Sequence, residues 1–84
     1  MNTHANLNTT EIERAAVAEL RAISERAGLA PYEIGVYSRT SPAVVKLAVL
    51  AGQLPRRRMT RERLLDFIRL NATTATRADV RSVP

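Results

Sequence analysis

Cysteine is absent from this chain of 84 residues, and histidine occurs once, at His4. Without thiols the protein has no disulfide, thiolate nucleophile or cysteine metal site, and an ordinary reducing cytoplasm is the expected location. His4 lies in a polar, aperiodic stretch, so no histidine-based triad or metal cluster can be built around it. The three glycines are scattered and form no phosphate-binding loop. We therefore expect a protein that is not an enzyme and has no metal, cofactor or small-molecule ligand.

Aromatic residues are also scarce, with only Tyr32, Tyr37 and Phe67 in the chain. No apolar run approaches the about 20 residues that a membrane span requires. The N-terminus has neither the basic nor the apolar region of a signal peptide. Alanine, leucine, arginine and valine dominate, and this composition favours one small helical domain over a sheet.

Acidic residues are nearly missing from the middle third of the chain. Residues 37–63 hold seven basic residues against Glu62 alone, a balance of +6, whereas residues 1–36 carry −2 and residues 64–84 carry +1. A surface charged only for solubility, the simplest alternative, would normally mix both signs. The concentration predicts a polyanionic partner, with nucleic acid favoured over an anionic membrane.

Apolar spacing and boundary residues predict two helices in the first half of the chain. Thr10 and Glu13 have the spacing of a capping box, which places a helix start at Thr10. The apolar stripe of this helix comprises Ile12, Ala16, Leu20, Ile23 and Ala27. A short second helix begins near Pro31, and Gly35 inside it predicts a close approach by another backbone.

Two further helices are predicted in the second half. Ser41 is the N-cap of the third helix and Gly52 its end, with Val45, Ala48 and Val49 as the core stripe and Leu50 at its edge. Thr60 caps the fourth helix, which runs to about Leu70, and its apolar residues are Leu64, Leu65, Phe67 and Ile68. We thus expect an all-α, four-helix domain over residues 10–71. Residues 1–9 are expected to be disordered, and residues 72–84 to form a flexible tail or a dimerisation arm.

The short second helix, the polar turn and the capped third helix make a helix-turn-helix. Ile34 is an apolar residue of its first helix and Gly35 the small residue at the crossing. Ser41 caps its second helix, and Val45 takes the core-facing position. With the preceding RAGLAPYEI, these residues resemble the Cro and phage-repressor-type (XRE-like) family over about residues 11–70. The resemblance implies a small bacterial, phage or plasmid transcription regulator that is associated with the nucleoid.

The turn itself departs from that family's pattern. Arg39 stands where the family usually has glycine, and Ser38 where it has an apolar residue. A non-glycine residue in the left-handed region costs about 1 kcal/mol or more, so the sequence leaves the shape of this turn open.

The outer face of the third helix is the expected reader of DNA bases in a major groove. This face offers few hydrogen-bonding groups, and apolar contact with thymine methyls would replace them in part. Simple core packing is the competing explanation for Val44 and Leu47. The candidate base-reading residues are Arg39, Ser41, Ala43, Val44, Lys46 and Leu47.

The arginine-rich loop after the third helix suits contact with phosphates, because guanidinium groups bind phosphate oxygens well. A second phosphate could bind at the start of the second helix through its backbone N–H groups. A solvated loop is the competing explanation. The candidate phosphate-binding residues are Tyr32, Arg56, Arg57, Arg58 and Arg61.

We thus expect a sequence-specific duplex DNA-binding protein that represses transcription by occupying a promoter or operator. One small module reads few base pairs, so a homodimer is expected, with Leu65, Val80 and Val83 as candidate contacts. The alternative is a protein-binding module, such as an antitoxin or adaptor, whose basic loop docks an acidic partner. RNA binding is disfavoured because no stacking aromatics alternate with the basic residues.

Overall fold

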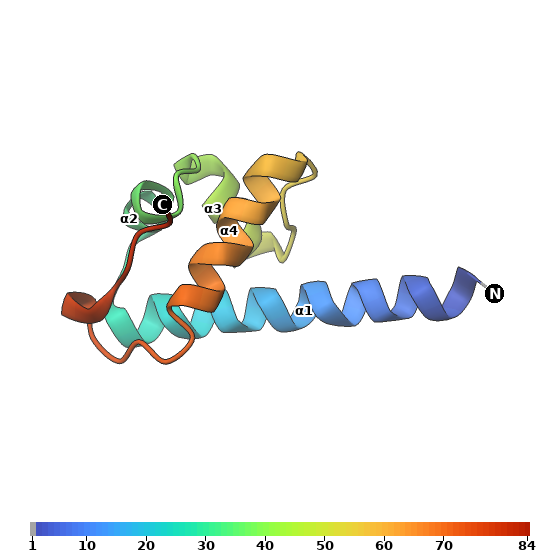
Figure 1. Ribbon diagram of the computed structural model, residues 1–84, viewed down its shortest axis with the longest axis horizontal. Coiled ribbons are helices and arrows are strands. Elements are labelled where there is room, and N and C mark those ends of the chain that lie inside the picture. Colours follow the sequence, from blue (N-terminus) through green and yellow to red (C-terminus); the bar gives the residue numbers. More distant parts are fainter. Residues whose placement is uncertain (1) are drawn as a thin grey trace.

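The computed structural model describes the backbone of residues 2–84 and the side chains of residues 10–84. Its helices are α1 (Asn2–Ala27), α2 (Pro31–Ser38), α3 (Pro42–Ala51) and α4 (Arg58–Leu70), followed by one 3₁₀ turn, η1 (Arg77–Asp79). The described chain contains no strand, and the prediction of an all-α, four-helix domain is confirmed. Figure 1 shows α2, α3 and α4 gathered along one side of the long α1, whose N-terminal end extends beyond them.

The core forms where α1 meets the three shorter helices. Leu20 and Ile23 of α1 are fully buried, as the apolar stripe predicts. Ile12 is 65% exposed, so its predicted place in the core is wrong. The N-terminal part of α1 extends past the other helices (Figure 1). The helix begins at Asn2 rather than at the predicted cap Thr10. The prediction of disorder over residues 1–9 concerns a segment whose side chains lie outside the described residues.

The α2–α3 pair is held by a very close approach of two backbones. A Cβ placed on Gly35 would lie 3.1 Å from the carbonyl oxygen of Thr40 and 3.3 Å from the nitrogen of Pro42. This confirms that glycine marks the crossing of the two helices. Val45 and Ala48 anchor α3 from the other side and are fully buried. Leu50, expected at the edge of the core, is instead 76% exposed.

Helix α4 also contributes buried residues to the core. Leu64, Phe67 and Ile68 are buried as predicted, and the helix ends at Leu70. Its first residue is Arg58, two residues before the predicted cap Thr60. None of the helices in the described part of the chain is long and apolar enough to cross a membrane.

The C-terminal residues 72–84, for which the sequence predicts a flexible tail or a dimerisation arm, contact the helices of their own chain. Val83 is 3% exposed, and its backbone N–H donates to the carbonyl of Tyr37 in α2 at 2.8 Å. Asn71 is fully buried at the end of α4. Its side chain binds both the N–H and the carbonyl of Arg81, at 2.8 and 3.0 Å. The sequence of residues 72–84 is polar and aperiodic, which is typical of a flexible segment. In the structure, the buried side-chain amide of Asn71 binds the backbone of this segment at Arg81.

Candidate nucleic-acid interface

The turn between α2 and α3 adopts the left-handed conformation at Arg39, with φ 59° and ψ 41°. Arg39 thus adopts a backbone conformation that glycine adopts at lower cost, and the turn is tight. Thr40 N–H donates to the carbonyl of Gly35 at 2.9 Å. Ser38, fully buried, shares a 2.8 Å hydrogen bond with the hydroxyl of Thr40. These bonds replace the apolar packing expected at position 38.

Helix α3 is fixed at both ends. At its start, the hydroxyl of Ser41 accepts a hydrogen bond from Val44 N–H at 3.3 Å, which confirms the predicted N-cap. At its end, Gly52 has φ 71°, and Nε of Arg21 in α1 donates to the carbonyl of Val49 at 2.7 Å. The helix is therefore held in one orientation before any partner binds.

Two positioning residues escaped the sequence reasoning, namely Arg21 and Arg63. Nη1 of Arg63 in α4 lies 3.5 Å from the carbonyl oxygen of Arg39, at the turn itself. Both arginines bind backbone carbonyls that lie 24 or more positions away in sequence. No local pattern could identify them, because any residue offers the same carbonyl acceptor.

The outer face of α3 exposes most of the candidate base-reading residues. Ala43 and Lys46 are exposed, and Leu47 is 53% exposed. The side chain of Arg39 is exposed beside them, in the turn. Val44 is half-buried and packs against the core, so packing accounts for much of its role.

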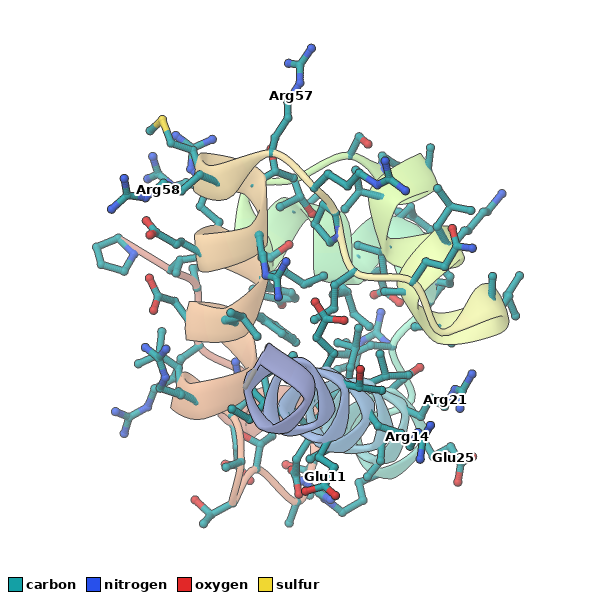
Figure 2. All side chains as sticks on the ribbon, turned by 90° about the vertical axis from the view of Figure 1, so that its right-hand side faces the viewer. Glu11, Arg14, Arg21, Glu25, Arg57 and Arg58 are labelled. Atoms are coloured by element: carbon teal, nitrogen blue, oxygen red, sulfur yellow. The ribbon has the colours of Figure 1, made fainter. Side chains whose placement is uncertain are left out.

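The candidate phosphate-binding residues divide into two groups. Arg56 and Arg57 are exposed, and among the described residues neither side chain has a hydrogen bond or ion pair. Figure 2 shows Arg57 pointing away from the helices, on the side of the molecule opposite Glu11. Arg58 is also exposed but lies 3.2 Å from Glu62, an ion pair open to solvent.

Arg61 has mainly a structural role in the domain. Its guanidinium forms an ion pair with Glu13 that joins α4 to α1, and both side chains are about two-thirds covered. Binding a phosphate would compete with this pair. Tyr32 is 61% exposed at the start of α2.

An apolar groove lies beside the basic loop. It measures about 240 Å³ and is lined by Val44 and Leu47 of α3 and by Leu54 and Pro55 of the loop. Gln53 and Arg56 also line the groove. The α3 surface is thus both basic and apolar, and a partner could use either property.

The candidate dimer contacts are mostly occupied within the chain. Val83 is buried, while Val80 and Leu65 are half-buried and pack against the core. Val80 and Val83 therefore have a role in the packing of their own chain. In the part of the chain whose side chains are described, no group of three or more His, Cys, Asp or Glu residues could hold a metal ion.

Comparison with known proteins adds no relative from which a role could be transferred. The chain matches no protein-family model, no characterised protein and no solved structure.

Proposed function

We propose that the chain binds duplex DNA sequence-specifically through α3 and the loop that follows it, as a small transcription regulator. The observation that carries this proposal is a set of basic side chains without partners beside an exposed, rigidly held helix. Lys46, Arg56 and Arg57 have no hydrogen bond or ion pair among the described residues. The tight Gly35 crossing and the Ser41 cap hold that helix against the domain with its outer face uncovered.

Unpaired basic side chains favour a phosphate backbone because they are already exposed and need no internal bond broken. Each lysine or arginine that neutralises a phosphate also releases condensed counterions, which drives association at low salt. Arg39 and Arg58 would add to this contact from either side of α3, with Glu62 competing for Arg58. Arg61 contributes less, since Glu13 already holds it.

Regulation would follow from occupancy of a promoter or operator, with the protein residing on the nucleoid. A single module of this size reads few base pairs, so two copies on half-sites about 10 base pairs apart would provide discrimination. Of the three candidate contacts, Leu65 and Val80 remain partly exposed and could join two copies, whereas Val83 is buried in its own chain. Sedimentation with and without operator DNA measures this directly.

The deciding experiment is fluorescence anisotropy on duplex DNA over a range of salt concentrations. Substituting alanine for Arg56, Arg57 and Arg58 together should weaken binding to all sequences and flatten log K against log[salt] by about 0.9 for each phosphate that is no longer neutralised. The matched control removes the same charge elsewhere, at the exposed residues Arg14, Arg69 and Arg81. Equal losses in both triple variants would reduce the interface to a general effect of net charge.

A second candidate function rests on the apolar groove. An acidic amphipathic segment of another protein could place apolar side chains against Leu47, Leu54 and Pro55 and acidic ones against Arg56. Leu54→Ala should weaken the binding of such a partner, whereas it should not change the binding of DNA. If that variant binds duplex DNA normally but the wild type binds acidic peptides more tightly than DNA, the protein-binding function is favoured.

A further inference from the structure

The outer face of α3 is unusual in the hydrogen bonds that it can make. From the turn to the end of the helix, residues 39–51, the only side-chain oxygens belong to Thr40 and Ser41. Both are already engaged, the first with Ser38 and the second with the N–H of Val44. The remaining polar groups are those of Arg39 and Lys46, and both side chains donate but never accept. Beyond Ser41, at the start of the helix, the described outer face of α3 therefore has no side-chain acceptor.

A surface of donors and apolar groups discriminates among bases because it cannot accept a hydrogen bond from a base amino group. In the major groove, adenine and cytosine each present an amino donor, whereas guanine presents two acceptors and thymine an acceptor and a methyl group. An amino group pressed against α3 would lose its water without gaining a partner, which is costly. Guanine and thymine have no such group on this edge.

The apolar part of the face is positioned to touch methyl groups. Ala43 and Leu47 lie one helical turn apart, and both are exposed, while Val45 and Ala48 hold the opposite side of the helix in the core. Because the N-terminal part of a recognition helix makes the base contacts, Ala43 and Leu47 would meet the groove floor before Leu50 does. Leu50 is equally apolar and 76% exposed, but lies nearer the C-terminal end of the helix.

Resting on the proposed duplex DNA binding, we propose that α3 reads thymine by its C5-methyl group, through Ala43 and Leu47, with Lys46 restricted to guanine. Around Ala43 and Leu47, where no side-chain acceptor lies, the face rejects adenine and cytosine if their amino groups would meet it on the strand being read. The ligand is therefore a site whose contacted strand carries thymine and guanine at the positions under the first two turns of α3.

Uracil provides the test, because it differs from thymine only in lacking that methyl group. The tightest duplex is first selected from a random pool, and each thymine in it is then replaced singly by uracil. At the positions under α3, binding should weaken about three- to five-fold for each contacted thymine, the change expected when one methyl is removed from an apolar surface. Uracil elsewhere in the duplex should have no effect.

Leu47→Ala should remove the sensitivity to uracil at one of these positions, while Leu50→Ala should keep it. Both residues are exposed, so circular dichroism of the two variants is expected to match that of the wild type. If uracil binds as well as thymine at every position, the methyl-reading inference is overturned, while the proposed function stands on the arginine experiment. If no duplex is bound above random background, the proposed function fails and this inference with it.

Discussion

Arginine has two different roles in two regions of this molecule. Around α1 and the C-terminal segment, Arg26 binds the carbonyls of Ala72 and Thr74, at 3.1 and 2.9 Å, and Arg77 binds Gly28 and Glu33. In the loop after α3, Arg56 and Arg57 bind nothing among the described residues. Figure 2 shows the side chain of Arg57 extended away from the helices. Net charge alone therefore overstates the surface available to a polyanion.

The difference reflects the acceptors within reach. Helix ends and the extended segment of residues 72–84 present carbonyls that no helical N–H satisfies, and a guanidinium fork can bind two of them at once. Removing an arginine from the first region should therefore lower stability, and from the second region should lower affinity for DNA.

The largest effect on stability is expected at Asn71, whose side chain binds the C-terminal segment of residues 72–84. Its side chain makes four hydrogen bonds, to Phe67, Thr74 and both backbone groups of Arg81. Asn71→Ala would leave buried groups without partners and should lower the free energy of unfolding by about 2–4 kcal/mol. Urea denaturation measures this. Thr73→Ala, at an exposed neighbour, should change it by less than about 0.5 kcal/mol. A stable, fully folded Asn71→Ala protein would contradict the role assigned to the segment.

A charge-matched pair separates the two regions more directly. Arg26→Ala removes two bonds to the C-terminal segment and should lower the free energy of unfolding by about 1 kcal/mol, with the salt slope of DNA binding unchanged. Arg56→Ala should leave stability within about 0.5 kcal/mol of the wild type and reduce the salt slope by about 0.9. Thermal unfolding and anisotropy on both variants are sufficient. If the two effects were exchanged, the division of the arginines would be wrong.

The smallest effect is expected at Arg39, which lies in the turn between α2 and α3 and combines a structural role with an exposed charge. Its backbone holds the left-handed turn, while its side chain faces the proposed DNA. Arg39→Gly should raise the free energy of unfolding by about 0.5–1 kcal/mol, because glycine adopts φ 59° without strain. Arg39→Ala keeps the strain and should not be stabilised. Both variants lose the same charge, so they should bind DNA with equally reduced affinity. Unequal affinities would mean that the shape of the turn, and not the guanidinium, limits binding.

The helices and most of their core were predictable because their signals are local. Ser41, Pro42 and Gly52 define α3 by capping and φ preference, and Gly35 indicated the crossing that the structure contains. Leu20, Ile23 and Phe67 followed from apolar periodicity. These inferences depend on neighbours within a few residues, and such neighbours are visible in sequence.

The errors have the opposite cause. Ile12 and Leu50 have the spacing of core residues, but whether an apolar residue is buried depends on which element lies opposite. Residues 72–84 look unstructured because their hydrogen-bond partners, Asn71, Arg26 and Tyr37, are distant in sequence or ordinary in type. In the candidate site, sequence reasoning placed the exposed face of α3 but missed that Glu13 holds Arg61.

The bond from Val83 to Tyr37 also sets an order of events in folding. The contact of α2 with α3 is local in sequence, whereas Val83 lies far along the chain from Tyr37, so the helix pair can form before this bond does. The carbonyl at the end of α2 then remains bound to water until the chain closes a long loop, which carries an entropic cost. The α2–α3 pair and the hydrogen bond from Val83 to Tyr37 thus form in separate steps. A chain that ends before residue 83 would lack this hydrogen bond and would present α3 after an α2 whose last carbonyls it does not hold.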